Sequence, residues 1–429
     1  MADKVKKVVV LGANGTMGAG AGGVFAGSGC EVAMLARERD KAEAGVRAAQ
    51  NAARAEAVSD RMTVGAYETD LQRAVGEADL VFESLAEDLA LKRHFFELVD
   101  QYRRPDTIVA TGSSGLSIEA MAQGRSRSFR EHFLGIHMFN PPHVIVGTEV
   151  IPGKDTLAEV LRSTLAMLAS RMGRKVIVSK DRPAFVGNRV GFKVLNQVAQ
   201  LSAEHGVAFV DYLIGPHTGR AMAPLATIDL VGWDVHKAIV DNVHDNCPDE
   251  AHSDFKLPGF MEQGIKEGRL GDKTPEVGGF YRKKGKEVLV LDPKSGSYQP
   301  LKKPEPIVFV EKMKSLNRVG RYSDAMACLR DAKGAEAELC RRVVLGYVSY
   351  GLNRVGEVAE TPRDVDIIMS YGFNWAPPTA MVDLLGAKQT IEMLSRLKLA
   401  VPACLEQAAS KGAKMFAGNV LDYGRTLAA

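Results

Sequence analysis

The stretch Val5-Lys-Lys-Val-Val-Val-Leu-Gly-Ala-Asn-Gly-Thr-Met-Gly18 decides the fold of the first half of the chain. Residues 5–11 form a β-branched, apolar run of the kind found in buried strands, and a glycine then recurs at every third position. Small residues continue to about Ser28, which suits a closely packed helix, and Glu31–Ala36 is a second strand-like run. We therefore predict a strand, a glycine-rich turn, a helix and a second strand.

Strand-like and helix-like segments continue to alternate up to about residue 180. The further apolar runs are Leu80–Phe82, Thr107–Ala110, Leu134–Ile136 and Lys175–Val178. Between two of them, Asp88–Tyr102 carries its apolar side chains on one helical face. Alternation of this kind predicts an α/β fold with a doubly wound, parallel sheet of the Rossmann type.

The character of the sequence changes after Asp181–Pro183. Amphipathic helical patterns dominate from there on, interrupted by a stretch rich in proline, glycine and lysine from Lys283 to about Pro306. We expect that stretch to be a strand-poor linker or an exposed extension. The predicted domains are an α/β domain over residues 1–181 and two all-helical domains over 182–300 and 301–429.

Two parts of the helical region resemble each other. Ala223-Pro-Leu-Ala-Thr-Ile-Asp-Leu-Val-Gly232 matches Pro377-Pro-Thr-Ala-Met-Val-Asp-Leu-Leu-Gly386. Upstream of these segments, and at nearly the same offset, the matching residues are Leu195–Asn196 with Leu352–Asn353 and Asp211 with Asp366. Matches in one order favour a duplicated helical domain over coincidence.

Composition excludes several classes of protein. The 429 residues include 55 Lys and Arg against 52 Asp and Glu, a net charge of +3 that leaves no basic stripe for nucleic acid. No apolar run reaches the ~18 residues of a membrane helix, and the first strand leaves no room for a signal sequence before it. The 5 scattered cysteines are typical of free thiols. We expect a cytoplasmic protein that binds neither nucleic acid nor membrane.

Three glycines lie where the first strand turns into the helix. Glycine there permits the tight turn and lets backbone N–H groups and the helix N-terminus approach a pyrophosphate. The spacing is one residue longer than the common dinucleotide fingerprint, and the alternative is a plain glycine-rich turn. The residues that we expect to bind a dinucleotide are Gly12, Gly15, Thr16, Met17 and Gly18.

The end of the second strand bears on the choice of cofactor. A carboxylate at that place binds the adenosine ribose 2′-OH and repels a 2′-phosphate. Here Ala36 is followed by Arg37, with Glu38 one residue further on. The missing acid and the added cation favour NADP, and the alternative is a solvated Arg37 with NAD as the cofactor. The sequence leaves NAD or NADP open.

Four segments carry a more specific pattern, which continues through Gly268–Thr274 and Gly279–Tyr281. They are Val81-Phe-Glu-Ser-Leu-Ala-Glu-Asp88, Ala110-Thr-Gly-Ser-Ser-Gly-Leu-Ser-Ile118, Leu134-Gly-Ile-His-Met-Phe-Asn-Pro-Pro142 and Lys180-Asp-Arg-Pro-Ala-Phe-Val-Gly-Asn-Arg189. Together with the glycine loop they resemble the L-3-hydroxyacyl-CoA dehydrogenase family, in the form with a duplicated C-terminal helical domain and no fused hydratase. The resemblance implies hydride transfer between L-3-hydroxyacyl-CoA and NAD(P)+, a reaction of the fatty acid β-oxidation type.

The resemblance also implies roles for individual residues. His137 matches the catalytic histidine, an imidazole that can exchange protons near neutral pH, and Glu149 matches the carboxylate that orients it. Ser114 and Asn188 match the residues that hydrogen-bond the substrate oxygen and the thioester end. The family's Asn-Thr-Ser-Ser is here Gly-Ser-Ser-Gly at 112–115, so the serine's role could instead belong to Ser113.

Three more residues match family positions that contact the nicotinamide half of the cofactor. They are Glu87, Lys92 and Asn140. The alternatives are a carboxylate stabilised by a helix N-terminus for Glu87, a solvated helix face for Lys92 and a turn-starting residue for Asn140. The helical stretch Lys41–Arg61 lies where family members contact the CoA phosphates.

We expect no metal site. His236, His244, Cys247 and His252 are close in sequence, but their spacing fits no standard zinc pattern and the chemistry needs no metal.

Single-copy members of the family dimerise through the helical domain. A chain with two copies can pack them against each other, so we expect either a monomer with this internal pairing or a homodimer. We expect the second copy to be architectural, or to cover the acyl chain. Two other functions stay open: a dehydrogenase of a free hydroxy acid or sugar acid, suggested by the altered 112–115 loop, and a non-catalytic cofactor-binding scaffold.

Overall fold

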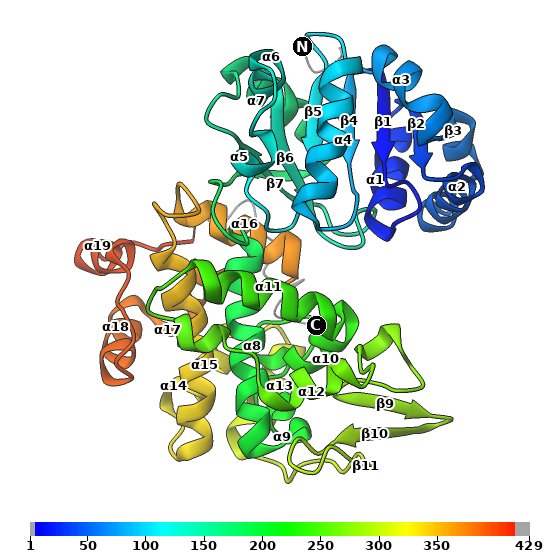
Figure 1. The fold of residues 1–429 in the computed structure, drawn as a ribbon. Coiled ribbons are helices and arrows are strands. Elements are labelled where there is room, and N and C mark those ends of the chain that lie inside the picture. The colour runs from blue at the N-terminus through cyan, green and yellow to red at the C-terminus, as the bar shows by residue number, and fades with distance from the viewer. Residues whose placement is uncertain (1–4, 417–429) are drawn as a thin grey trace. The chain divides into compact units, whose positions relative to one another are not determined.

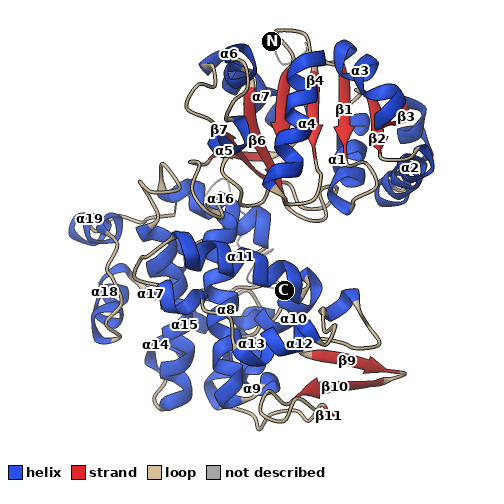
Figure 2. Cartoon of the chain, viewed as in Figure 1, coloured by secondary structure: helices blue, strands red, loops and turns tan. Residues whose placement is uncertain are grey.

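A computed structural model describes residues 5–416 of the chain, which divides into two compact units, Met1–Phe185 and Val186–Ala429. Unit 1 is a sheet flanked by helices, and unit 2 is mostly helical with one small sheet (Figures 1 and 2). The predicted α/β fold followed by a helical region is confirmed. The predicted division into three domains stays a prediction.

The sheet of unit 1 has eight strands in the order β3-β2-β1-β4-β5-β6-β7-β8. Their bounds are β1 Lys7–Leu11, β2 Glu31–Ala36, β3 Met62–Ala66, β4 Leu80–Glu83, β5 Ile108–Thr111, β6 Phe133–Met138, β7 Gly147–Pro152 and β8 Lys175–Val178. β1 to β6 are parallel, whereas β7 runs antiparallel to β6 and parallel to β8. The predicted doubly wound parallel sheet is therefore confirmed, with an antiparallel step between β6 and β7 that the sequence did not indicate. β3 and β7 were not predicted.

Helices cover both faces of the sheet because each inner strand alternates between two cores. Val8 and Val10 of β1 face one core with α1, α2 and α7, and Val9 and Leu11 face the other with α3, α4, α5 and α6. The helices are α1 Thr16–Gly27, α2 Arg39–Ala53, α3 Tyr67–Glu77, α4 Leu89–Tyr102, α5 Ile118–Ala122, α6 Arg127–Glu131 and α7 Ala158–Ala166. α2 ends before the left-handed Arg54, so the helix expected up to Arg61 is shorter, and a 3-10 turn follows it.

Glycine is required at the turn after β1. Gly12 has a φ of +82°, and a Cβ on it would lie 2.2 Å from the carbonyl oxygen of Ser84, just after β4. A Cβ on Gly18 would lie 2.2 Å from the carbonyl oxygen of Gly12. β1, β4 and α1 therefore approach one another more closely than a larger residue would allow. β1 and β4 are also the strands between which the strand order reverses, where α/β sheets bind their ligands.

Unit 2 is built mainly from helices. They are α8 Gly187–His205, α9 Val207–Leu213, α10 Pro224–Val231, α11 Trp233–Asn246, α12 Gly259–Lys266, α13 Val308–Arg318, α14 Tyr322–Asp331, α15 Ala335–Asn353, α16 Pro362–Phe373, α17 Pro378–Leu385, α18 Ala387–Arg396 and α19 Ala403–Lys411. The predicted boundary at residues 300 and 301 falls between the small sheet and α13.

The stretch predicted to be a strand-poor linker or an exposed extension contains a three-stranded antiparallel sheet, so the expected lack of strands is wrong and the first helical copy includes this sheet. The strands are β9 Tyr281–Lys284, β10 Glu287–Leu291 and β11 Tyr298–Pro300, with β10 in the middle. Leu289 and Leu291 of β10 are buried, and the guanidinium of Arg282 lies 4.3 Å from the ring centre of Tyr298. The lysines around Gly285 are solvated at the hairpin turn, and they obscured this pattern in the sequence.

The duplicated segments fold alike. α10 and α17 are both 8 residues long and begin with a proline. Asp211 accepts hydrogen bonds from the backbone N–H groups of Leu225 and Ala226 in the first turn of α10, and Asp366 accepts one from Thr379 in the first turn of α17. The repeat recognised in the sequence is therefore visible in how each copy holds the start of the same helix.

Candidate active site

His137 and Glu149 form a buried pair across two antiparallel strands. They are directly opposed in the register of β6 and β7, which places both side chains on the same face. His137 Nδ1 lies 2.6 Å from Glu149 Oε2, and the residues are 3% and 0% exposed. A hydrogen bond from Nδ1 to an ionised carboxylate leaves the lone pair of an imidazole on Nε2. The sequence placed these residues 12 positions apart, and the hairpin brings them together.

The surroundings of His137 are aromatic. Its ring centre lies 4.8 Å from that of Phe139 and 5.7 Å from that of Phe185. His137 lies near the end of β6, which is parallel to β5 and, through it, to β4 and β1. The imidazole therefore lies at the carboxyl edge of the sheet, the same edge as the glycine turn after β1.

A second buried group of charges lies at the end of β4. Lys92 Nζ is 2.7 Å from Glu83 Oε1 and 3.3 Å from Glu87 Oε2, and both Lys92 and Glu83 are buried. Thr111 Oγ1 donates to the other oxygen of Glu83 at 2.6 Å. The alternative of a solvated Lys92 is wrong because that side chain is 1% exposed, and the expected contact of Glu87 and Lys92 with the nicotinamide stays a prediction.

Glu87 links this group to the serine loop. Its Oε1 accepts hydrogen bonds from the Ser113 hydroxyl and, at 3.0 Å, from the backbone N–H of Ser114. Burial would raise the pKa of Glu87, but Lys92 and the hydrogen bond from Ser113 together hold the pKa below its ordinary value. The carboxylate is therefore ionised at neutral pH and fixes the loop that follows β5.

The N-terminus of α1 is suited to bind an anion. Gly15 is its N-cap and makes no side-chain cap, and the first turn contains no acidic residue. Thr16 is exposed and Met17 half-buried. The first N–H groups of a helix have no partner within the helix, so this turn presents unused donors at the edge of the sheet. The residues present therefore fit the pyrophosphate of a dinucleotide.

Two residues near the glycine turn bear on cofactor binding. Tyr67 is the first residue of α3, and its hydroxyl accepts a hydrogen bond from the Gly12 N–H at 2.8 Å. Burial raises the pKa of Tyr67 to about 12. Arg37 is exposed just after β2 and makes no ion pair with any residue between 5 and 416. Sequence reasoning missed Tyr67 and Glu83, because only the fold shows that their polar atoms meet Gly12 and Lys92.

One arginine holds the connection between β6 and β7. Arg174, which is buried, donates to the carbonyl oxygens of Pro142, Ile145 and Gly147 and to Thr148 Oγ1. Asn140 is exposed at the start of the same connection. The guanidinium therefore fixes the loop between His137 and Glu149, and Asn140 lies at the edge expected for a cofactor contact.

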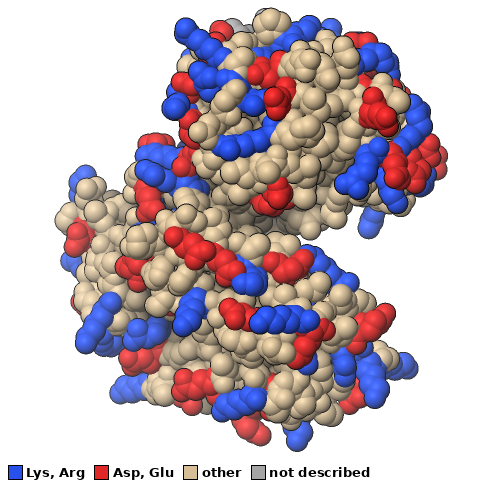
Figure 3. Space-filling view, viewed as in Figure 1, with Lys and Arg blue, Asp and Glu red and all other residues tan. Residues whose placement is uncertain are grey.

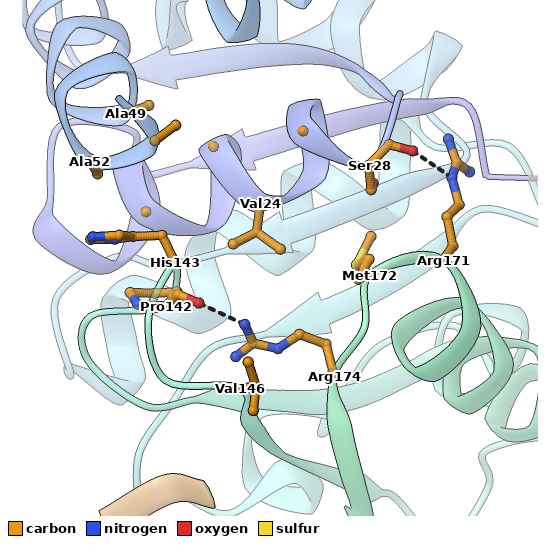
Figure 4. Close-up of a pocket in the computed structure, with 14 residues that line it drawn as sticks. Val24, Ser28, Ala49, Ala52, Pro142, His143, Val146, Arg171, Met172 and Arg174 are labelled. Atoms are coloured by element: carbon orange, nitrogen blue, oxygen red, sulfur yellow. Dashed lines mark hydrogen bonds between the residues drawn. The ribbon is translucent and has the colours of Figure 1, made fainter. Parts of the chain in front are cut away.

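A groove of about 320 Å³ lies beside α1 in unit 1 (Figure 4). Small side chains on two helices leave the space open: Gly20, Gly23 and Gly27 on α1, and Ala49, Ala52 and Ala53 on α2. Pro142, His143 and Val146 of the loop after β6 line it too, as do Arg171 and Arg174. The groove therefore runs from the loop that follows His137 along α1 to Ser28, whose carbonyl oxygen accepts from Arg171 (Figure 4).

Asn188, the remaining predicted site residue, belongs to unit 2. It is the second residue of α8 and is 5% exposed. The histidines considered for a metal site make other contacts: His236 Nε2 lies 3.0 Å from Asn196 Oδ1, and the rings of His244 and His252 stack with their centres 4.1 Å apart. In the described part of the chain, no three histidine, cysteine or acidic side chains are grouped in a way that could hold a metal ion.

Acidic and basic side chains are interspersed over the face drawn in Figure 3, without a continuous basic stripe. Within residues 5–416, no helix combines the length and apolar character needed to span a membrane.

The strand order, the glycine turn and the uncapped helix define unit 1 as a Rossmann-type dinucleotide-binding domain. Comparison with family models narrows this class. Residues 7–182 match the model described as 3-hydroxyacyl-CoA dehydrogenase, NAD binding domain, and residues 185–283 match that described as 3-hydroxyacyl-CoA dehydrogenase, C-terminal domain. The chain belongs to the 3-hydroxyacyl-CoA dehydrogenase family, which confirms the resemblance of the sequence motifs.

Individual relatives agree with this assignment. A probable 3-hydroxyacyl-CoA dehydrogenase of Deinococcus radiodurans is 34% identical over 294 residues, which cover 65% of this chain and 83% of that protein. One of Bacillus subtilis is 32% identical over 385 residues, 85% of this chain and 46% of that protein. The chain spans about half the length of several curated relatives that it matches.

The fold is also found in a solved structure. The crystal structure of 3-hydroxybutyryl-CoA dehydrogenase from Escherichia coli K12 superposes with a TM-score of 0.69 at 22% identity, over 95% of this chain and 99% of that one. The likeness extends over both units and shows a shared fold.

Proposed function

We propose that the chain interconverts L-3-hydroxyacyl-CoA and 3-ketoacyl-CoA with NAD or NADP, a reaction of the fatty acid β-oxidation type. The observation that carries the proposal is the His137–Glu149 pair, a buried imidazole held by a buried carboxylate at the carboxyl edge of a dinucleotide-binding sheet. Membership of the family and the names of the relatives support the substrate class.

The cofactor would be held by the turn from Gly12 to Gly18 and by the uncapped N-terminus of α1. Glu87 and Lys92 supply a fixed, paired charge beside the serine loop, where we place the nicotinamide half. When bound, the nicotinamide accepts or supplies the hydride. Asn140 is proposed as a further contact on the same edge.

The proton of the substrate hydroxyl is the task of His137. Its Nε2 takes the proton during oxidation and returns it to the ketone oxygen during reduction. Glu149, hydrogen-bonded to Nδ1, keeps the imidazole in this tautomer and stabilises the imidazolium. We propose that Ser114 and Asn188 donate to the substrate, since the Ser113 hydroxyl already donates to Glu87.

The test is oxidation of NADH and NADPH, in parallel, by acetoacetyl-CoA, followed at 340 nm with the purified full chain. We expect His137→Asn to lower kcat by about 10²–10⁴-fold and Glu149→Gln by at least about tenfold. His132→Asn is the matched control, because His132 adjoins β6 and its Nδ1 lies 3.0 Å from the Ser128 carbonyl oxygen rather than beside a carboxylate. No oxidation by the wild type contradicts the proposal, and equal rates with a free 3-keto acid would favour a free-acid dehydrogenase.

The same assay decides the role of Arg37. A higher rate with NADPH than with NADH, with the preference lost in Arg37→Gln, would assign Arg37 to the 2′-phosphate. A preference for NADH that Arg37→Gln leaves unchanged would make Arg37 a solvated residue.

We propose that the groove beside α1 holds part of the CoA group. Its glycine and alanine lining leaves room, and it adjoins the loop after β6 that follows His137. Ala52→Glu, which adds a negative charge next to the groove, should raise KM for acetoacetyl-CoA about tenfold, equivalent to about 1.4 kcal/mol, and leave KM for NADH unchanged. Ala52→Gln has nearly the same size without the charge and should have a much smaller effect. Equal KM values for both variants and the wild type would contradict this placement.

We propose that the chain is a monomer in which the two helical copies pair with each other. α8 and α16 pack closely, since a Cβ on Gly191 would lie 2.3 Å from the ring of Phe373. Sedimentation velocity should then give a mass near 46.3 kDa, and a mass twice as large would indicate a homodimer. The cytoplasm stays the predicted compartment.

A further inference from the structure

Arg189 directly follows Asn188 in the first turn of α8. Its side chain is 1% exposed, so its charge is removed from water and must be met by protein groups. Its Nε donates to Tyr350 Oη at 2.6 Å, its Nη1 to Cys247 Sγ at 2.7 Å, and its Nη2 to Asp249 Oδ2 at 2.7 Å and Glu357 Oε1 at 3.0 Å.

Two of these partners belong to the second helical copy. Tyr350 lies on α15 and Glu357 just beyond it, whereas Asp249 follows α11 of the first copy. Tyr350 Oη also donates to Asp249 Oδ2 at 2.8 Å, so the one hydroxyl joins the arginine to the carboxylate. The second copy therefore closes the hydrogen-bonded ring around Arg189.

Arg354 supports this ring from behind. Its Nη1 donates to Asp249 Oδ2 at 2.8 Å and lies 2.7 Å from Glu357 Oε2, and its guanidinium is 4.6 Å from the ring centre of Tyr350. Glu250 pairs with the other nitrogen of Arg354 at 2.8 Å. Asp249 and Glu357 are thus each held between the guanidinium groups of Arg189 and Arg354, and Glu250 pairs with Arg354.

The surroundings shift the pKa values of two members of this ring, Tyr350 and Asp249. Burial raises the pKa of Tyr350 well above its ordinary value, so its hydroxyl keeps the proton that it donates. Burial would also raise the pKa of Asp249, but hydrogen bonds from Arg189 and Tyr350 hold it below the ordinary value. At neutral pH Tyr350 therefore donates and the ionised Asp249 accepts in this ring.

Arg189 belongs to the first turn of α8, which begins at Gly187 and whose N-cap residue, Val186, makes no side-chain cap. Anchoring Arg189 in a buried network holds this turn, and it acts one residue away from Asn188.

We propose that Tyr350 and Glu357 are positioning residues: through Arg189 they fix the first turn of α8 and thereby the Asn188 side chain that binds substrate. The inference rests on the proposed function and deepens it. It gives the second copy, which we expected to be architectural, a part in substrate recognition without any contact to the substrate.

The test compares Tyr350→Phe with Tyr347→Phe in the full chain. Both remove a buried tyrosine hydroxyl from α15, but Tyr347 donates to the Ala376 carbonyl and does not touch Arg189. We expect Tyr350→Phe to lower kcat/KM for acetoacetyl-CoA at least about tenfold, mainly through KM, with the dissociation constant of NADH unchanged. Tyr347→Phe should keep wild-type kcat/KM at a comparable loss of thermal stability.

A second variant keeps the inference testable if Tyr350→Phe does not fold. Glu357→Gln removes one charged partner of Arg189 and should also raise KM for acetoacetyl-CoA, whereas Glu357→Asp should restore part of the loss. An active wild type whose kcat/KM survives in both Tyr350→Phe and Glu357→Gln overturns the inference alone. A wild type that oxidises neither NADH nor NADPH overturns the proposed function and this inference with it.

Discussion

The two helical copies of unit 2 place a carboxylate at the same point of their repeated sequence, and the two carboxylates accept hydrogen bonds from different segments of the chain. In the first copy, Asp229 is 3% exposed and accepts from Trp233 Nε1 and from the backbone N–H groups of Phe280 and Tyr281, where β9 begins. In the second copy, Asp383 is half-buried and accepts from Met415 and Phe416.

This difference shows how duplicated copies can specialise without changing their frame. In the first copy the small sheet is attached through Asp229, and the Tyr281 hydroxyl returns to Asp211 at 2.9 Å. The second copy has the corresponding helices, but its Tyr350, on α15, and Arg354, just after α15, contact Arg189 and Asp249 of the first copy. We therefore expect changes in the first copy to cost more stability, and changes at the junction to affect the site.

The largest effect on stability is expected at Asp229. Asp229→Ala leaves three buried donors without an acceptor, which should lower the free energy of unfolding by about 3–5 kcal/mol. Asp383→Ala leaves two backbone donors at a half-exposed position that water can reach, and should cost about 1–2 kcal/mol. The 2 tryptophans of the chain, Trp233 and Trp375, both lie in unit 2, so urea unfolding followed by tryptophan fluorescence reports this unit. Equal losses in the two variants would contradict the specialisation.

The second prediction concerns pH. Burial raises the pKa of Asp211 to about 6 and those of Asp229 and Asp366 to about 7. The unfolded chain releases the protons of these carboxyl groups near pH 4, whereas the folded chain retains them to higher pH. The three protonated carboxyl groups therefore contribute their full stabilisation below about pH 4, and this contribution is lost as the pH rises to about 7. His217 and His236, whose pKa burial lowers to about 4 and about 3, act in the opposite sense, because their contribution is lost as the pH falls below about 6.5.

Asp366→Asn isolates the carboxyl contribution. The amide does not titrate, so the free energy of unfolding of the variant relative to the wild type should rise between pH 4 and pH 7, by at most about 1.4 kcal/mol per pH unit, and stay constant above. Urea unfolding at a series of pH values, again followed by tryptophan fluorescence, measures this difference. A difference that does not change with pH would mean that Asp366 is ionised throughout.

Parts of the fold could be predicted because local patterns coincide with burial. β2 has the predicted bounds, and β1 is recognisable, because parallel strands buried on both faces read as continuous apolar runs. β7 was missed because its Thr148 and Glu149 are buried against Arg174 and His137 rather than among apolar side chains. Such burial depends on partners that are distant in sequence.

The candidate site divides in the same way. The glycine turn follows from steric rules that act within a few residues, and His137, Glu149 and Asn188 were found through the family's motifs. Glu83 and Tyr67 give no such signal, because their roles arise only when β4 meets α4 and β1 meets α3. The network of Arg189 is even harder to predict from the sequence, since it joins residues of two copies that are more than 100 positions apart.

The smallest expected effect on stability concerns the N-termini of α9 and α16, the helices that carry Asp211 and Asp366. α16 begins with a capping box, in which Thr361 Oγ1 accepts from the Asp364 N–H at 3.3 Å and Asp364 accepts from the Thr361 N–H at 2.8 Å. The N-cap residue of α9 is Gly206, which has no side chain that could accept a hydrogen bond from the first turn. Thr361→Ala should therefore cost about 1 kcal/mol of unfolding free energy, whereas Thr361→Ser keeps the hydroxyl and should stay within a few tenths. If urea unfolding shows the same loss of unfolding free energy in both variants, the methyl group of Thr361 rather than its hydroxyl cap stabilises α16. The N-termini of α9 and α16 would then not differ in capping energy.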